Sequence, residues 1–434
     1  MKGKEKDRKV FLLAMSCNGI KNIEKDIHIG FYKDTITKKF SRSKYNIKGI
    51  YGENGVGKSA IITAAYIFRE LLTNPNYLNN PITNDKILYL LNKKTEKANI
   101  EFEYLIESEE INIYKVGFEI KENAIFKNEI VHEYGYVRKP NTKYKLLYET
   151  IDGELKYNGN KKFNEYITEK TKNILKEKSF ICSVANSNID DKYNNDLYDI
   201  ENIFVCGIYT YVYIDSKDTH DDYMLSKYIG RMLKDPEDIV KVSKPLSFLT
   251  CSGPINVDAK AIVSFRKEIE SLSNFIREFK SDLNRINIDE TPNKDSIICD
   301  LIFEYKDYKV AAEFESTGIK KLVELYIAFK CVSQGYVVFI DELDANIHDY
   351  YLCKLLEYVG EYSKGQLCFT THNLGPMRVL KDYKKSIDFI SRDGSVVPWI
   401  KNGNYDVSSL YKQGKIDKSP FNIESFDFLS VFEG

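Results

Sequence analysis

Hydrophobic and polar residues along the first third of the chain follow the two-residue repeat of strands more often than a helical repeat. Short apolar runs at residues 10–15, 27–31 and 45–51 predict three strands. Residues 60–72 are rich in alanine, isoleucine and leucine and contain no glycine or proline, which predicts a helix. The chain therefore begins with strands and turns to a helix directly after the third one.

A region of antiparallel strands is predicted next. Residues 98–106 and 110–120 alternate apolar and polar positions around a short break, as in a hairpin. Residues 143–150 and 154–157 predict a further pair of strands. Helical patterns then appear at 163–178 and 224–233, with a short apolar segment at 180–184 between them, so that strands give way to helices.

The clearest helical period lies between residues 262 and 286. Apolar residues there alternate steps of three and four: Ile262, Phe265, Ile269, Leu272, Ile276, Phe279, Leu283 and Ile286. This seam predicts one helix of about 37 Å at about 1.5 Å per residue. Two interpretations are open: a long helix packed on its own domain, which we favour, or a short coiled-coil arm that dimerises.

The chain returns to strands after Pro292. Residues 297–305 and 308–314 predict a hairpin through Lys306 and Asp307, followed by a helix at 322–329. Further strands are predicted at 337–340, before His372, at 387–390 and at 396–400. The whole order predicts an α/β fold with an antiparallel β unit and a helical insertion. The predicted division is 1–160, 161–290 and 291–434.

Composition narrows the class of protein. The 434 residues are 43% hydrophobic, and 63 Lys and Arg balance 64 Asp and Glu, for a net charge of −1. This balance gives no general attraction to nucleic acid or anionic membrane. A basic stretch at 38–44 could contact nucleic acid, although a solvated loop is the simpler interpretation. The eight scattered cysteines and the absence of a long apolar run predict a cytoplasmic protein without a zinc site or membrane span.

One segment carries a clear phosphate-binding pattern between the third strand and the first helix. It reads Gly52-Glu53-Asn54-Gly55-Val56-Gly57-Lys58-Ser59, a P-loop. Glycines allow the backbone to aim its N–H groups at an anion, at the positive end of the following helix. Lys58 is expected to bind the β- and γ-phosphates of ATP, and the Ser59 hydroxyl to bind Mg²⁺.

Two later strands end in residues suited to the same chemistry. The apolar strand at 337–340 is followed by Asp341 and Glu342, the Walker B pattern. Asp341 is expected to hold Mg²⁺, and Glu342 to act as the general base toward the attacking water. His372 follows another strand and could donate a hydrogen bond to the γ-phosphate. Upstream, Ser316 is a candidate helix cap, with Gly318 leaving the backbone accessible.

Together, these motifs resemble the ABC-type ATPase heads of the SMC, RecF and OLD group. The similarity is greatest to OLD-like AAA family ATPases of bacterial anti-phage and abortive-infection systems, through the Asp341-Glu342-Leu343-Asp344 and Glu315-Ser316-Thr317-Gly318 forms. The resemblance implies two heads that enclose two ATP molecules. Each ATP would contact Lys58 and Ser59 of one copy and Ser316 and Gly318 of the other. Asp344 would lie at the seam, and His372 would sense the γ-phosphate.

The chain departs from this group in three ways. Thr317 replaces a glycine of the usual signature motif. No glutamine lies between the P-loop and that motif, so Asn186 is the candidate substitute for the missing Q-loop residue. The 62 residues after His372 leave no room for the Toprim nuclease domain that OLD proteins often carry. A toxic activity, if one exists, is therefore expected on a separate protein.

Three functions follow from the resemblance. The first is an ATPase that dimerises or oligomerises on ATP and regulates a separate effector, in anti-phage defence. The alternative is a RecF-like ATPase that clamps DNA during repair. The third, a nucleotide-binding subunit of a transporter, is disfavoured by the missing Q-loop glutamine and the large insertions. Neutral net charge favours the first over the second.

Overall fold

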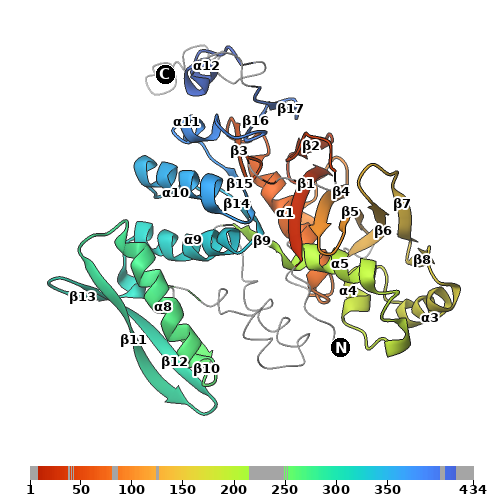
Figure 1. Cartoon of the computed structure of the whole chain (residues 1–434), viewed down its shortest axis with the longest axis horizontal. Helices are drawn as coiled ribbons and strands as arrows, with labels where there is room; N and C mark the ends of the chain where they lie inside the picture. The colour runs from red at the N-terminus through yellow and green to blue at the C-terminus, as the bar shows by residue number, and fades with distance from the viewer. Residues whose placement is uncertain are drawn as a thin grey trace, which may run out of the picture.

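The computed structural model describes residues 8–37, 40, 42, 44–80, 87–123, 127–214, 249, 251, 253–400 and 406–416. In this part of the chain, three sheets are joined and covered by helices (Figure 1). Two of the sheets enclose a central helix, and the third forms a smaller unit beside them. The predicted α/β class, with an antiparallel β unit, is confirmed.

The antiparallel sheet has seven strands in the order β2-β1-β4-β5-β6-β7-β8. Both predicted strand pairs between 98 and 157 are present. The sequence did not reveal β6, because two of its inward-facing positions are the polar residues Asn128 and Glu133. The strands are β1 Lys9–Asn18, β2 Ile27–Gly30, β4 Lys97–Glu107, β5 Ile111–Glu122, β6 Asn128–Arg138, β7 Lys145–Ile151 and β8 Glu154–Tyr157.

The second sheet has six strands in the order β17-β16-β3-β15-β14-β9. Every neighbouring pair is parallel except β16 and β17. The strands are β3 Ile47–Gly52, β9 Thr210–Tyr213, β14 Val337–Ile340, β15 Gln366–Thr370, β16 Ile387–Ile390 and β17 Val396–Pro398. A parallel arrangement places the carboxyl ends of β3, β15 and β14 at one edge.

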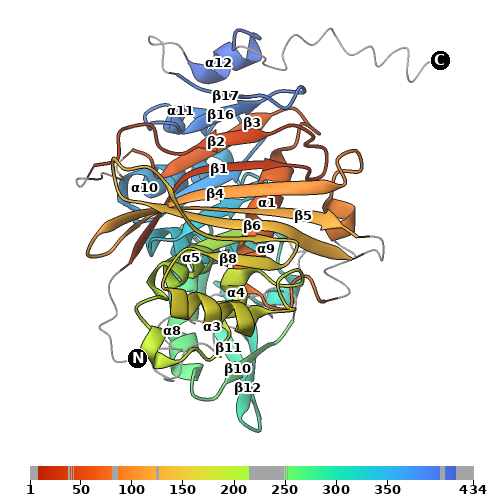
Figure 2. The same cartoon turned by 90° about the vertical axis from the view of Figure 1, so that its right-hand side faces the viewer.

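Helix α1 (Lys58–Thr73) lies between the two large sheets, and the antiparallel sheet covers it in Figure 2. All its residues except Ser59 are buried. Phe68 stacks on Phe102 of the antiparallel sheet at 4.1 Å between ring centroids, and Phe339 of the parallel sheet belongs to the same core. A helix that is buried on all sides requires such a setting between two layers. The helix after the P-loop is thus held from both faces.

Other helices cover the opposite face of the parallel sheet or flank the antiparallel one. The first group contains α9 (Thr317–Ser333), α10 (Asp349–Tyr362) and α11 (Met377–Leu380), and α12 (Val407–Lys412) packs on α11. The second group contains α3 (Lys161–Thr171), α4 (Phe180–Ala185) and α5 (Tyr198–Ile208). Segment 180–184 is therefore helical, with the Ser179 side chain accepting a cap bond from Cys182 N. The predicted helix at 224–233 lies outside the described residues.

The predicted helix at 262–286 is too long. Helix α8 (Ile262–Arg277) ends earlier, and Leu283 and Ile286 belong to strand β11 (Leu283–Asn293). A β-bulge between Leu283 and Arg285 lets both residues point into the core at a spacing of three, which imitates a helical period. The helix packs on its own sheet, as the favoured interpretation held, and forms no coiled-coil arm.

That third sheet joins strands β10, β12 and β11, with β13 paired to β12. The expected hairpin through Lys306 and Asp307 is present. Glu268 of α8 accepts hydrogen bonds from Tyr326 and Lys330 of α9, which ties this unit to the rest of the chain. Its other strands are β10 Ile255–Asp258, β12 Ser296–Tyr305 and β13 Lys309–Ala311.

The eight cysteines are all buried thiols outside any disulfide, and therefore act as small apolar residues. In the described part of the basic stretch, Phe40 packs on Phe11 at 4.9 Å, and Arg42 donates to the Lys364 carbonyl at 3.2 Å. These side chains are engaged within the chain itself. No helix among the described residues is long and apolar enough to cross a bilayer.

Candidate functional site

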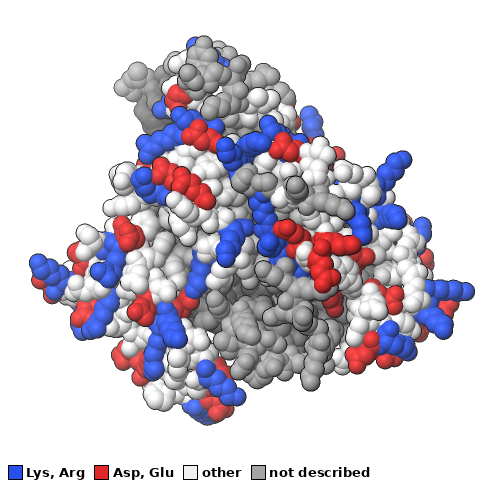
Figure 3. Space-filling model, viewed as in Figure 1, with Lys and Arg blue, Asp and Glu red and all other residues white. Residues whose placement is uncertain are grey.

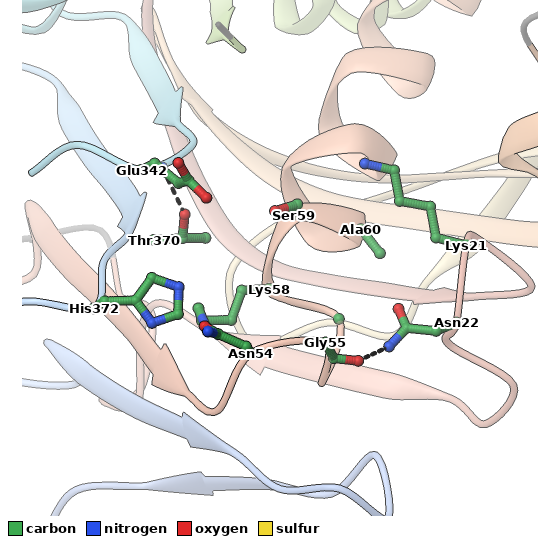
Figure 4. Close-up of a pocket in the computed structure, with 11 residues that line it drawn as sticks. Lys21, Asn22, Asn54, Gly55, Lys58, Ser59, Ala60, Glu342, Thr370 and His372 are labelled. Atoms are coloured by element: carbon green, nitrogen blue, oxygen red, sulfur yellow. Dashed lines mark hydrogen bonds between the residues drawn. The ribbon is translucent and has the colours of Figure 1, made fainter. Parts of the chain in front are cut away.

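A cleft of about 800 Å³ opens where the parallel strands end. The P-loop contributes Asn54, Gly55, Gly57, Lys58 and Ser59 to its lining. Glu342 follows β14, Thr370 ends β15 and His372 comes two residues later. Figure 4 shows Glu342, Thr370 and His372 on the side of the cleft facing Lys58. The structure therefore brings the P-loop together with Glu342 and His372, which come 283 and 313 residues after Ser59 in the sequence.

The P-loop conformation requires its glycines. Gly55 and Gly57 have φ angles of 80° and 109°, in the left-handed region that other residues adopt only with strain. A Cβ at Gly57 would also come within 2.8 Å of Ile23 Cγ1. The turn after β1 thus packs directly on the loop. Lys58 then begins α1, whose positive end faces the cleft.

Lys58 is held by the loop itself. Its Nζ donates to the carbonyls of Gly52 and Glu53, each at 2.8 Å. Burial lowers the pKa of Lys58 to about 8, although nearby carboxylates, first Asp341 and then Glu342, oppose the shift. An anion placed beside a lysine ammonium that is so poorly solvated stabilises its charged form. The cleft therefore favours a negatively charged ligand.

Thr370 links the two acidic residues that follow β14. Its hydroxyl donates to Asp341 Oδ1 at 2.5 Å and accepts from the Glu342 backbone N–H at 2.8 Å. Glu342 has a φ of 49°, an uncommon left-handed backbone for a residue with a side chain. Strained positions of this kind cluster at active sites. The exposed Glu342 side chain is directed to the cleft by this conformation (Figure 4).

His372 lies across from Lys58 in the cleft. Burial, and next the charge of Lys58, lower the pKa of His372 below its ordinary value. The imidazole is therefore neutral at pH 7 and can donate one hydrogen bond without carrying charge.

Three polar residues of the lining, Lys21, Asn22 and Thr370, are not among the predicted site residues. Lys21 and Asn22 come from the turn between β1 and β2. The Asn22 side chain donates to the Gly55 carbonyl (Figure 4). No local pattern marks Lys21 and Asn22, because their position depends on the packing of Ile23 against Gly57.

The predicted signature residues lie apart from this cleft. Ser316 is exposed and caps α9, where its side chain accepts from Ile319 N at 3.4 Å. A Cβ at Gly318 would lie 3.4 Å from the Asn346 carbonyl, so the signature is beside the segment that contains Asp344. Neither Ser316, Gly318 nor Asp344 lines the cleft of its own chain.

Asn186, the candidate substitute for the Q-loop glutamine, does not line the cleft. Its side chain donates to the Cys182 carbonyl within α4 at 2.7 Å. The amide is used to end a short helix, so the structure gives it no part in the site.

The ligands predicted for Mg²⁺ are a hydroxyl and a carboxylate, the type of oxygen donor that this ion prefers. Ser59 lines the cleft, and Asp341 contacts Thr370, which lines it too. The described residues contain no group of three His, Cys, Asp or Glu side chains able to hold a metal alone. Mg²⁺ is usually bound by one or two protein oxygens, with phosphate oxygens and waters as its other ligands. Ser59 and Asp341 suit this mode, which requires a phosphate ligand.

No protein-family model matches the sequence, and no curated protein matches it. Solved structures of similar fold include two SMC head domains. The one from Pyrococcus furiosus, bound to the C-terminal domain of ScpA, has 16% identity and a TM-score of 0.38, and the match covers 90% of this chain and 96% of that one. The one from Pyrococcus yayanosii has 11% identity and a TM-score of 0.42, with coverage of 93% and 100%.

The recombination mediator protein RecF, solved with ATP, has 12% identity and a TM-score of 0.38, with coverage of 90% and 98%. Identities and TM-scores this low do not carry the activity or partners of these proteins over to this chain. The residues of the cleft must therefore support any function on their own chemistry.

We predict that Thr370→Val lowers the free energy of unfolding by about 1–3 kcal/mol, because Asp341 and the Glu342 amide each lose a buried partner. Valine keeps the shape of threonine but lacks the hydroxyl. Urea denaturation measures the change. Thr168→Val, on the exposed side of α3, is the matched control and should stay within about 0.5 kcal/mol of the wild type. An equal effect of both variants would contradict the bridging role of Thr370.

Proposed function

We propose that the chain is an ATPase that binds ATP with Mg²⁺ in this cleft and hydrolyses it to ADP and phosphate. One observation carries the proposal: a glycine-rich loop, the cation Lys58, the carboxylate Glu342 and the neutral His372 meet in one cleft. This combination suits phosphoryl transfer to water, where catalysis consists of positioning and of stabilising charge. A bound Mg²⁺ ion would neutralise charge on the phosphates.

Each residue has a role in this scheme. Lys58 would leave the carbonyls of Gly52 and Glu53 to bind the β- and γ-phosphates, and the N–H groups of the loop would bind the same oxygens. Ser59 and Asp341 would hold Mg²⁺. Glu342 would orient the attacking water and accept its proton. His372 would donate a hydrogen bond to the γ-phosphate.

We further propose that two copies of the chain share each nucleotide. The support is the position of Ser316 and Gly318 at the N-terminus of α9, where neither residue is buried and neither lines the cleft of its own chain. ATP bound to one copy would contact the N-terminus of α9 in the other. Hydrolysis would remove the γ-phosphate and weaken the pair, which links turnover to assembly.

The wider role stays a prediction. The regulation of a separate effector agrees with the charge balance, since acidic and basic side chains are interspersed on the face shown in Figure 3. Clamping of DNA is the alternative. A duplex-binding affinity that falls steeply as salt rises would favour the alternative, because release of counterions drives such binding.

Glu342→Gln is expected to trap the assembled state, because glutamine keeps the shape of the side chain but cannot accept the proton from water. With Mg-ATP, light scattering after size exclusion should find a species of about twice the monomer mass. Lys58→Ala with ATP is the control and should remain a monomer. A Glu342→Gln variant that elutes with ATP as the nucleotide-free wild type does would contradict the shared site.

ATP affinity is expected to fall as pH rises through 8. Without nucleotide, burial holds the pKa of Lys58 at about 8. Bound phosphates would raise this pKa, so binding above pH 8 requires the uptake of a proton. The dissociation constant for Mg-ATP should thus be roughly tenfold higher at pH 9 than at pH 7. Calorimetry in buffers of different ionisation enthalpy measures both the affinity and the proton uptake, and a constant affinity would contradict the role of Lys58.

A further inference from the structure

The turn between β16 and β17 contacts the P-loop from outside the cleft. Arg392, in this turn, donates from Nε to the Glu53 carboxylate. The Arg392 side chain is 82% exposed, whereas that of Glu53 is only 20% exposed. Glu53 does not line the cleft, although its neighbour Asn54 does. The carboxylate is therefore held outside the cleft, against the turn.

The turn is built to keep Arg392 in place. Asp393 accepts from the Ser395 backbone N–H at 3.0 Å, and from the hydroxyls of Ser391 at 2.5 Å and Ser395 at 2.7 Å. Strand β16 also packs on the start of the P-loop, where a Cβ at Gly52 would lie 2.7 Å from the Ile390 carbonyl. The arginine thus lies in the turn that follows β16, a strand in direct contact with the P-loop.

Stability alone does not explain this pair. An exposed ion pair contributes little to the free energy of folding. A carboxylate beside a phosphate-binding loop has a larger effect on ligand affinity than on folding, because the loop must bind several negative charges. An unpaired Glu53 carboxylate would repel the negative charges of the phosphates. This repulsion would be stronger than in water, because the surroundings of Glu53 are partly buried.

We propose that Arg392 is a positioning residue for the nucleotide. It holds the Glu53 carboxylate away from the cleft and neutralises it, so that the P-loop presents a net positive field to the phosphates. This inference rests on the proposed ATP site. It adds a residue from the β16–β17 turn, which the sequence motifs do not mark, to the groups that set nucleotide affinity.

Calorimetric titration with Mg-ATP at 50 mM and 500 mM salt tests the role of Arg392. Arg392→Ala should weaken binding about fivefold at low salt and less than twofold at high salt, because the effect is electrostatic and screened. The loss should be smaller for Mg-ADP, which carries less charge. Arg392→Ala combined with Glu53→Gln should bind within about twofold of the wild type, since the repelling charge is gone.

Lys384→Ala is the matched control, because Lys384 forms an ion pair with Asp34 at 3.0 Å that does not involve the P-loop. This variant should bind Mg-ATP as the wild type does. An unchanged affinity in Arg392→Ala would overturn the inference. So would a double variant as weak as Arg392→Ala, since Arg392 would then act other than through Glu53. A wild-type protein that binds no Mg-ATP would instead overturn the proposed function, and the role of Arg392 with it.

Discussion

The parallel pairing of β3, β15 and β14 is the constraint on which the site depends. Strands that run in one direction end at one edge, so whatever follows them meets there. The P-loop, the Glu342 segment and His372 each follow one of these strands. The apolar side chains of these three strands are buried on both faces of the sheet, between α1 on one side and α9 and α10 on the other. The core therefore fixes the register that aligns the site.

The cleft holds its groups in states that a bound anion would relieve. Lys58 is desolvated and donates to two loop carbonyls, and Glu342 has a left-handed backbone held by Thr370. Features of this kind are typical of sites that stabilise charge. The exposed N-terminus of α9 carries the other half of the proposed site. A nucleotide between the two surfaces would act as the link between subunits.

Most residues of the P-loop and the two acids after β14 can be picked out from the sequence, because the motifs that contain them are local. A P-loop between a strand and a helix, or two acids after an apolar strand, can be read without knowledge of distant contacts. The residues that were missed depend on such contacts. Lys21 and Asn22 reach the cleft because Ile23 packs on Gly57, and Arg392 meets Glu53 because β16 pairs with β3.

The errors in the fold have a similar origin. Strand β6 was missed because its inward face holds Glu133, which Tyr148 and the N-terminus of α4 satisfy. The helix ending at Arg277 was extended because a β-bulge places Leu283 and Ile286 on one face. In both cases contacts between distant residues decide the structure, and the local pattern of apolar residues carries no information about these contacts.

The central claim is that one copy supplies the P-loop and the other the α9 N-terminus. Mixing two inactive variants, Lys58→Ala and Gly318→Asp, tests it most directly. If sites are shared, each mixed dimer has one intact site of two, so ATPase activity that neither variant shows alone should return on mixing. If each chain holds a complete site, the mixture would stay as inactive as its parts, which would contradict the account.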